Sequence, residues 1–392
     1  MISGNGINWG TIPVNNNNDW TSICWAPELS LFVAVSSTGT NNRIITSNNG
    51  FDWVTRNNPI DNNWTSVCWA PELSLFVAVA NTGTNDRIMT SSDGINWTSR
   101  TNPVDNNWTS ICYSTELNLF VAVSNSGTSN RIMTSSDGIN WNIQINPVDN
   151  DWTSICYSSD LNLFVSVSNS GTNNRVMTSS DGINWISRVS AVDNNWTSIC
   201  WASNLNLFVA VSNSGTNNRV MTSSNGINWT SQVSAVNNNW TSVCWSNKLN
   251  LLIAVADSGT NNRIMISPDG INWSISNIIY KSVSSNKNIS MNSIFASTNY
   301  SLAICGESTI VKGWGWDSSS YSTGLGNLPI TQNGLTNVKK IVGSQKVIKI
   351  LLNNGTVQTR GFNQLGEIGT IALNTGALFY KTPPYTVQNI NT

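Results

Sequence analysis

Apolar and polar residues follow one repeated order along the first 273 residues, and residues 54–97 hold one copy of it. Residues 64–69 alternate in character and are rich in aromatic and β-branched side chains, which is typical of a half-buried strand. Residues 75–79 form a short continuous apolar run, which predicts a strand buried on both faces. Residues 87–90 and 95–100 predict two further strands, and turn-forming residues separate all four. The copy therefore predicts four short antiparallel strands.

This four-strand pattern recurs every 44 residues, and a tryptophan followed by Thr-Ser-Ile/Val-Cys opens each copy. A period of this length indicates a repeat architecture. One such sheet cannot cover its own two faces, whereas copies stacked around a ring can. The sequence therefore predicts an all-β fold, a single β-propeller of four-stranded antiparallel blades. The repeated tryptophans are Trp20, Trp64, Trp108, Trp152, Trp196 and Trp240.

The turn between the third and fourth strands carries the most specific motif. Residues Ser91–Trp97 read Ser-Ser-Asp-Gly-Ile-Asn-Trp and resemble the Asp-box of bacterial neuraminidase repeats, found in sialidase-like propellers, although the turn is one residue shorter. The resemblance implies a structural hairpin clasp rather than an active site. Further copies span Ser135–Trp141, Ser179–Trp185, Ser223–Trp229 and Ser267–Trp273, with weaker copies at Ser47–Trp53 and Ser3–Trp9, where Asn replaces Asp. The structural residues that it implies are Asp93, Trp97, Asp137, Trp141, Asp181, Trp185, Asp269 and Trp273.

The strict period fades after Trp273. Residues 292–296 and 300–305 look like degenerate first and second strands of a seventh blade. Residues 313–316 and 351–366 are similar to regulator-of-chromosome-condensation repeats, although Arg360 stands where that family has an aromatic residue. That family also builds propellers, so the resemblance implies a further blade, but neither nucleotide exchange nor chromatin docking is carried over.

These counts predict one ring of eight blades. Residues 1–290 would form the blades with the 44-residue period, and residues 291–392 would complete the same ring. Residues 1–9 would supply a lone fourth strand that completes the last blade and closes the ring. The alternative is a seven-bladed ring closed by the same strand, with residues near 320–392 as a separate lobe.

Composition narrows the chemistry. Only 10% of the residues are charged, the net charge is −1, and there is no histidine, which removes Ser-His-Asp and Cys-His catalysis and His-ligated metal sites. We expect no cofactor, no metal and no nucleic-acid partner. We also expect no membrane insertion and no signal peptide, and hence a place in the cytoplasm of a host cell or on a virion surface. Six cysteines recur at the 44-residue step, and we interpret them as buried apolar residues in a reducing compartment.

One face of the predicted ring collects the loops that precede the first strands and the loops between the second and third strands. It would bind a glycan or an acidic partner surface through forked arginine donors. Alternatively, each arginine pairs with the Asp of an adjacent loop or with backbone carbonyls and only fixes the blade. The candidate residues are Arg43, Arg87, Arg131, Arg175, Arg219 and Arg263 with Asp61, Asp105, Asp149 and Asp193. The opposite face carries the Asp-boxes together with Glu28, Glu72, Glu116 and Asp160.

An active site needs one asymmetric set of groups, and the repeats supply equivalent copies instead, so we assign no catalytic residue and expect no enzyme. The Asn-rich repeats resemble the tandem propeller proteins of large DNA viruses and phages. That resemblance implies a scaffold for protein interactions that is virion-associated or acts on a host. A lectin-like, multivalent glycan-binding protein is the alternative, and a sialidase-like hydrolase is the least favoured.

Overall fold

The computed structural model describes residues 1–276 except positions 13 and 15, and the backbone of the strands between residues 278 and 361. The chain divides into two compact units, Met1–Val283 and Ser284–Thr392. The described residues are strands and connecting turns, apart from a 3-10 turn at Ser203–Leu205. The structure confirms the predicted propeller of four-stranded antiparallel blades.

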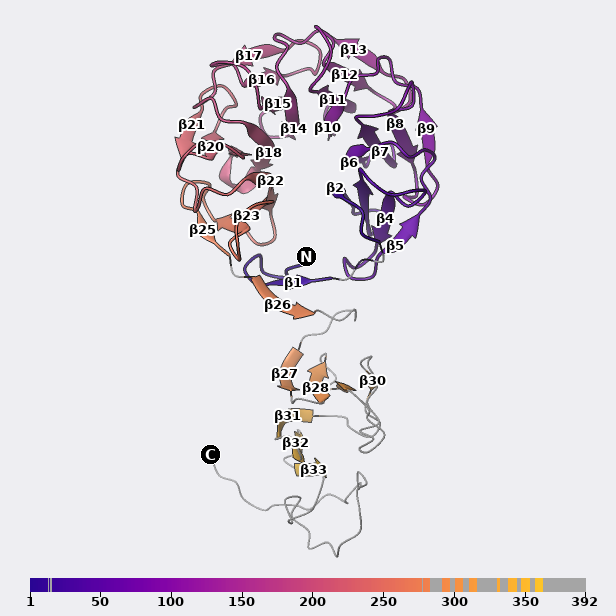
Figure 1. The fold of residues 1–392 in the computed structure, drawn as a ribbon, viewed down its shortest axis with the longest axis vertical. Coiled ribbons are helices and arrows are strands. Elements are labelled where there is room, and N and C mark those ends of the chain that lie inside the picture. Colours follow the sequence, from indigo (N-terminus) through magenta and orange to yellow (C-terminus); the bar gives the residue numbers. More distant parts are fainter. Residues whose placement is uncertain are drawn as a thin grey trace, which may run out of the picture. The chain divides into compact units, whose positions relative to one another are not determined.

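The first unit contains six four-stranded blades, and the first strand of each lines the centre of the ring (Figure 1). Blade 1 consists of β2 (Trp20–Ala26), β3 (Leu31–Ser36), β4 (Ile44–Ser47) and β5 (Val54–Arg56). Blade 2 consists of β6 (Trp64–Ala70), β7 (Leu75–Ala80), β8 (Ile88–Ser91) and β9 (Thr98–Arg100). Blade 3 consists of β10 (Trp108–Ser114), β11 (Leu119–Ser124), β12 (Ile132–Ser135) and β13 (Asn142–Gln144). Blade 4 consists of β14 (Trp152–Ser158), β15 (Leu163–Ser168), β16 (Val176–Ser179) and β17 (Ile186–Arg188). Blade 5 consists of β18 (Trp196–Ala202), β19 (Leu207–Ser212), β20 (Val220–Ser223) and β21 (Thr230–Gln232). Blade 6 consists of β22 (Trp240–Ser246), β23 (Leu251–Ala256), β24 (Ile264–Ser267) and β25 (Ser274–Ile275).

The predictions of eight blades and of seven blades are both wrong, because the ring has six. The strands from residue 291 onward belong to the second unit. They form a four-stranded and a three-stranded sheet in the second unit, β27 (Met291–Ala296) to β30 (Ile330–Thr331) and β31 (Val338–Gly343) to β33 (Val357–Gly361). The physical reason is that residues after 273 lose the tryptophan step that joins blade to blade. The side chains of the stretch that resembles chromosome-condensation repeats lie outside the described residues.

The N-terminal strand also differs from the prediction that it is the fourth strand of the last blade. β1 (Trp9–Thr11) pairs in parallel with β26 (Ile278–Ser282). Ile2 bridges Gly10, which closes residues 2–10 into a hairpin around the first Asp-box. Figure 1 shows β1 between blade 6 and blade 1.

The apolar core lies between neighbouring blades. Trp64 of blade 2 is fully buried against Val33 and Val35 of blade 1, and the same arrangement recurs around the ring. Burial of one tryptophan side chain corresponds to about 4–6 kcal/mol of transfer free energy. This repeated contact explains the 44-residue tryptophan step, since each tryptophan joins its blade to the one before.

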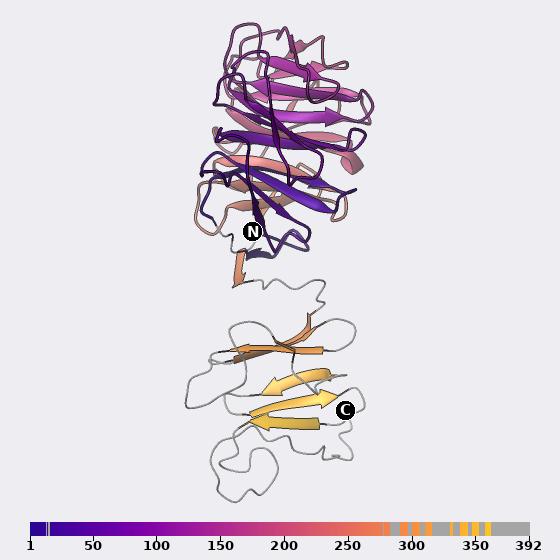
Figure 2. The same cartoon turned by 90° about the vertical axis from the view of Figure 1, so that its right-hand side faces the viewer.

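The Asp-box turns also bring adjacent blades together. Gly94 adopts a φ of +70°, a left-handed conformation that favours glycine, and a Cβ there would lie 2.7 Å from the Leu31 side chain of the preceding blade. A side chain at this position would therefore push two blades apart. The side view shows the blade loops gathered at the two opposite faces of the ring (Figure 2).

Candidate functional site

The predicted arginine face is built from a clasp that recurs at successive blades. In blade 2, Arg87 Nε donates to Gly83 O at 2.9 Å, and its Nη1 donates to Asn81 O at 3.0 Å. The same Nη1 also donates to Asn106 O at 2.9 Å in the linker that leads to blade 3. The guanidinium thus holds its own loop in shape and ties that loop to the next linker.

The linker aspartate completes the clasp. Asp105 Oδ1 accepts from Asn85 N–H and from Asn102 Nδ2, each at 2.8 Å, and lies 3.7 Å from Arg87 Nε. The hydrogen bond from Asn102 and the one from Asn85, together with the charge of Arg87, lower the pKa of Asp105 despite partial burial. Asp61 and Asp149 have the same contacts and likewise lowered pKa values. The structure therefore brings the predicted Arg–Asp pairs together.

The pairs are Arg43–Asp61, Arg87–Asp105, Arg131–Asp149 and Arg175–Asp193, at 3.6–3.8 Å. Arg219 faces a linker with Asn237 in place of the aspartate, and Asn237 Oδ1 accepts from Asn217 N–H at 2.7 Å. Arg263 Nε donates to Gly259 O at 2.8 Å, and the linker that follows blade 6 lies largely outside the described residues.

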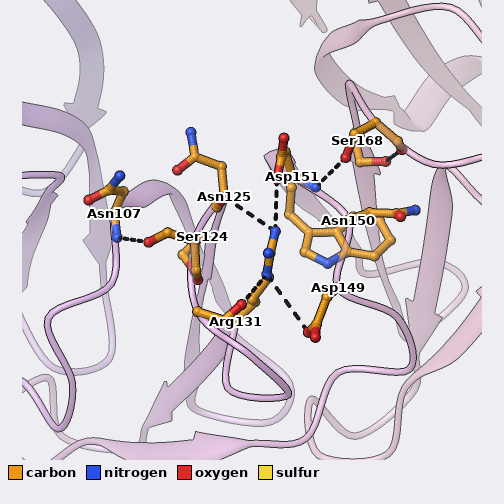
Figure 3. A network of polar contacts seen from close by, with 12 residues as sticks. Asn107, Ser124, Asn125, Arg131, Asp149, Asn150, Asp151 and Ser168 are labelled. Carbon is orange, nitrogen blue, oxygen red and sulfur yellow. Dashed lines mark hydrogen bonds and ion pairs between the residues drawn. The ribbon is translucent and has the colours of Figure 1, made fainter.

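Arg131 makes the strongest version of the clasp (Figure 3). Its Nη1 lies 2.8 Å from Asp151 Oδ1, and its Nε lies 3.8 Å from Asp149 Oδ1. Asp151 stands where the neighbouring linkers carry Asn107 and Asn195, so this one guanidinium holds two carboxylates. Charge-assisted hydrogen bonds of this kind are roughly twice as strong as neutral ones.

A row of linker asparagines, which the sequence analysis did not single out, extends the clasp. Asn106 Nδ2 donates to both Asn130 O and Asn130 Oδ1, at 2.8 and 3.0 Å, and the Asn107 N–H donates to Ser126 Oγ at 2.7 Å. Each linker is thereby joined to the loops of both blades that it connects. The only sequence signal was the Asn-Asn or Asn-Asp pair before each repeated tryptophan. The row comprises Asn18, Asn62, Asn106, Asn150, Asn194 and Asn238.

These contacts bear on the two interpretations of the face. The paired arginine side chains are only 12–13% exposed, and their Nε and Nη1 groups donate to oxygens of the ring itself. The contacts are those that the bracing interpretation describes. Binding of a ligand at the face stays a prediction.

The opposite face carries the Asp-boxes. Asp93 Oδ1 accepts from Ile95 N–H and Asn96 N–H, and its Oδ2 accepts from Asn96 Nδ2, all at 2.7–2.8 Å. Partial burial acts to raise the pKa of Asp93, but these hydrogen bonds and one from Ser91 outweigh it and lower the pKa to about 2. Trp97 Nε1 donates to Gly94 O at 3.1 Å and closes the turn.

Exposed apolar side chains form two rows on this Asp-box face. Leucines of the turns between first and second strands are 37–41% exposed, and isoleucines of the Asp-boxes are 44–54% exposed. The acidic residues beside the leucines contact the next blade: Glu28 accepts from Trp69 Nε1 at 2.8 Å, and Asp160 accepts from Trp201 Nε1 at 2.7 Å. The rows are Leu29, Leu73, Leu117 and Leu161, and Ile7, Ile95, Ile139, Ile183, Ile227 and Ile271.

The six repeat cysteines are free thiols. Burial raises the pKa of the Cys24 thiol to about 12, and that of Cys68 well above its ordinary value, so these groups are poor nucleophiles. Among the residues that the structure describes, no three His, Cys, Asp or Glu side chains are grouped so as to hold a metal ion. Nor is any helix within the described part long and apolar enough to cross a membrane.

Comparison with known proteins supports the fold alone. No protein-family model and no curated protein matches the chain. YCF48 from Cyanidioschyzon merolae is similar in structure, with a TM-score of 0.50 and 12% identity over 76% of this chain and 95% of that one. The β-propeller domain of Cps50 (Swd1) from Myceliophteria thermophila matches with a TM-score of 0.40 and 13% identity, over 76% of this chain and 95% of that one. The likeness to YCF48 supports a propeller built from repeated blades.

Proposed function

We propose that this chain is a non-enzymatic β-propeller scaffold that mediates protein interactions, as a virion-associated or host-interaction protein. The observation that carries the proposal is the two rows of exposed leucine and isoleucine on the Asp-box face. Apolar side chains that recur on a rigid surface are typical of protein-interaction sites. The virion or host setting rests on the resemblance of the repeats to tandem propellers of large DNA viruses and phages.

The distribution of charged residues favours a scaffold over an enzyme. Catalysis requires unlike groups gathered at one place, where they can divide the roles of nucleophile, acid and base. The arginines and aspartates of the described blades are equivalent copies, and most of their polar atoms are used in the inter-blade clasps. An enzyme of this architecture would need one blade to differ from the others at its centre.

The test uses the purified full chain as bait for proteins of the host. A recovered partner is expressed separately, and its affinity is measured for the wild type and for the triple variant Ile95→Asp, Ile139→Asp and Ile183→Asp. We expect binding to weaken at least tenfold. The matched control is Ile145→Asp, because Ile145 is 76% exposed but lies at the start of a linker, toward the arginine face. Equal loss in the control, or full binding by the triple variant, would refute an interaction through the Asp-box face.

A glycan array tests the lectin-like alternative. That hypothesis expects reproducible binding that disappears when Arg87, Arg131 and Arg175 are changed together to methionine. Such a result would replace the scaffold proposal by a glycan-binding function of the arginine face. Hydrolysis of a sialoside by the purified chain would refute both.

A further inference from the structure

Three copies of the Asp-box carry asparagine directly before the glycine of the turn. They are the boxes of Asn5, Asn49 and Asn225, and residues 1–276 contain no other Asn-Gly pair. Asn-Gly is the sequence in which asparagine deamidates most readily, because glycine has no side chain to hinder its own main-chain nitrogen. Deamidation replaces asparagine by aspartate, which is the residue that the other copies hold at this position. The three boxes are therefore candidate sites of a covalent change that the chain makes on itself.

The nucleophile of this reaction is the main-chain nitrogen of the glycine. It bonds to the Cγ atom of the asparagine side chain, the Cγ–Nδ2 bond breaks, and the amide leaves as ammonia with the proton that the glycine nitrogen gives up. Water then opens the resulting succinimide ring. Cleavage between the glycine nitrogen and Cγ gives aspartate, whereas cleavage between that nitrogen and the main-chain carbonyl carbon gives isoaspartate. A glycine N–H that is already hydrogen-bonded is a poorer nucleophile, because that bond must break before the attack.

In the asparagine boxes of blades 1 and 5, a serine hydroxyl holds the glycine N–H. Gly50 N–H donates to Ser47 Oγ at 2.9 Å. Gly226 N–H donates to Ser223 Oγ, also at 2.9 Å. Both serines are buried at the ends of strands β4 and β20. The four boxes that carry aspartate make the same bond at 2.8–2.9 Å, so this contact is a regular part of the boxes after the first.

The first box lacks this contact. Ser3 Oγ donates to Asn5 Oδ1 at 3.2 Å and accepts from Asn5 N–H at 3.3 Å, the same distances as in the box of Asn225. The Gly6 N–H, however, makes no hydrogen bond with Ser3 or with any other of the described residues. Of the three Asn-Gly boxes, the first is therefore the one whose glycine nitrogen is not held.

The turn also supplies donors to the carbonyl group that would be attacked. Asn5 Oδ1 accepts from Ile7 N–H at 3.0 Å and from Asn8 N–H at 2.9 Å. Negative charge develops on this oxygen when a nitrogen adds to Cγ, and main-chain N–H groups aimed at such an oxygen stabilise the charge. Asn5 is exposed, so water has access to it. The first box thus combines a polarised carbonyl, an unheld nucleophile and access for water.

The hairpin around the first box is closed by an isolated bridge rather than by a strand ladder. Ile2 and Gly10 exchange two hydrogen bonds of 2.9 Å. In blade 5, by comparison, β20 and β21 pair through three residues on each strand. Segments held by few hydrogen bonds open locally at low cost, and the attack needs a brief departure from the turn geometry. We therefore expect Asn5 to reach a reactive arrangement more often than Asn225.

We propose that Asn5 is a site of spontaneous deamidation in the folded protein, and that the serine contact shields Asn49 and Asn225 from the same reaction. The co-reactant is water, and the product is an aspartate box in the N-terminal hairpin. The second oxygen of the new carboxylate lies within reach of the Asn8 side-chain amide, because the aspartate boxes make the equivalent bond at 2.7–2.8 Å. The reaction therefore completes a box that the sequence leaves incomplete.

The aspartate product tightens the hairpin that lies against blade 6. Ser276 Oγ, which follows β25, donates to Ile7 O at 2.6 Å, and a Cβ at Gly6 would lie 2.7 Å from Leu251. Isoaspartate instead lengthens the main chain inside the turn by one carbon, which shifts the Ile7 and Asn8 N–H groups away from the carboxylate. The two products therefore have opposite effects on this contact.

The test follows the three sites in one purified full chain that is incubated at neutral pH with and without urea. Peptide mapping by mass spectrometry measures, at each site, the fraction of chains in which the amide NH2 has been replaced by OH. In the native chain we expect Asn5 to react at least about tenfold faster than Asn225. In urea the rates should converge, because the contact that separates them is lost. A protease that cleaves before aspartate but not before isoaspartate distinguishes the two products.

Two variants complete the test. Ser223→Ala removes the hydroxyl that holds Gly226, so Asn225 in the native variant should react at a rate near that of Asn5, while Asn5 keeps its own rate. Asn5→Gln should remove the fast product, because glutamine closes its larger ring much more slowly. Equal native rates at Asn5 and Asn225, an unreacted Asn5 in native chains at a time when urea has converted it, or an unchanged Asn225 in folded Ser223→Ala would overturn the proposal. If Ser223→Ala does not fold, the comparison of the native and urea-unfolded wild type decides alone.

Discussion

Replacing Asn225 by aspartate should stabilise blade 5, because the boxes that carry aspartate show what the substitution adds. In the box of blade 3, Asp137 Oδ1 accepts from Ile139 N–H and Asn140 N–H at 2.8 and 2.7 Å. Its Oδ2 also accepts from Asn140 Nδ2 at 2.7 Å. Asn225 makes the two backbone bonds, each at 2.9 Å, but has no second carboxylate oxygen for the Asn228 side chain.

The size of the gain follows from the protonation behaviour of Asp137. Partial burial acts to raise its pKa, but the bonds from Asn140, Ile139 and Ser135 outweigh burial and lower the pKa from 3.8 to about 2. The full shift would correspond to roughly 2.4 kcal/mol at about 1.4 kcal/mol per unit. Because the box is largely open to solvent, screening reduces the expected gain for Asn225→Asp to about 1 kcal/mol at pH 7.

The sign of the pH dependence follows from the lowered pKa. The folded state holds the carboxylate ionised below the unfolded value of 3.8, so the gain is present above that pH and disappears as pH falls toward 2. The gain in unfolding free energy is measured by urea unfolding at pH 7 and pH 2.5. The proteins compared are the wild type, Asn225→Asp and the reverse change Asp137→Asn. Adding Asn228→Ala should remove part of the gain. An Asn225→Asp variant that is no more stable at pH 7, or equally stabilised at both pH values, would refute the reasoning.

Three further experiments test the packing and the polar contacts between blades. Trp152→Ala should cost about 3–5 kcal/mol in thermal unfolding, since Trp152 is fully buried between blades; a cost below about 1 kcal/mol would contradict that packing. Arg131→Met should destabilise the chain by roughly 1 kcal/mol more than Arg175→Met in urea, because Arg131, unlike Arg175, holds a second carboxylate. In thiol labelling of the native chain, Cys244 should react before Cys24, since Cys244 is exposed and Cys24 is partly buried; equal rates would contradict that difference in burial.

Hydrophobic patterning was sufficient to place the blade strands. The apolar run at 75–79 corresponds to β7, and the segment at 64–69 corresponds to β6. The fourth strand was predicted to begin at residue 95, but β9 begins at Thr98 because residues 91–97 are held in the Asp-box turn. Hydrogen bonds from the backbone to the Asp93 side chain set where β9 begins, and the alternation of apolar and polar residues carries no signal for these bonds.

The number of blades could not be predicted in the same way. Each repeat encodes its contact with the next blade through the tryptophan and the Thr-Ser pair, and these contacts are local. Ring closure depends instead on the angle that accumulates over all the blades. The weak strand signals at 292–305 were therefore assigned to the ring, although the structure places those strands in the second unit.

The candidate site shows the same limit. The Arg–Asp pairing was one of two interpretations left open by the sequence, because an arginine in a loop can serve a ligand or a neighbouring carbonyl equally well. The asparagine row, with Asn106 as its example, was missed because asparagine is abundant at nearly every loop of the chain. Only the geometry separates an asparagine that joins two blades from one that faces solvent.

The repetition itself indicates where specificity can arise. In a ring of near-identical blades, each blade pairs the polar groups of its neighbour and covers that neighbour's apolar side chains. Where two described blades meet, these groups are therefore not available to a partner protein. Among the described residues the two end blades differ: Ile23 is 57% exposed, and the Thr241 hydroxyl donates only within its own blade, to Val255 O. The N-terminal hairpin lies against both of these blades. A Cβ at Gly6 would meet Leu251 of blade 6, and a Cβ at Gly50 of blade 1 would meet Ile2 of the hairpin. The repeated rows of the Asp-box face, by contrast, present the same exposed leucine and isoleucine side chains several times, so they suit contacts that are made many times.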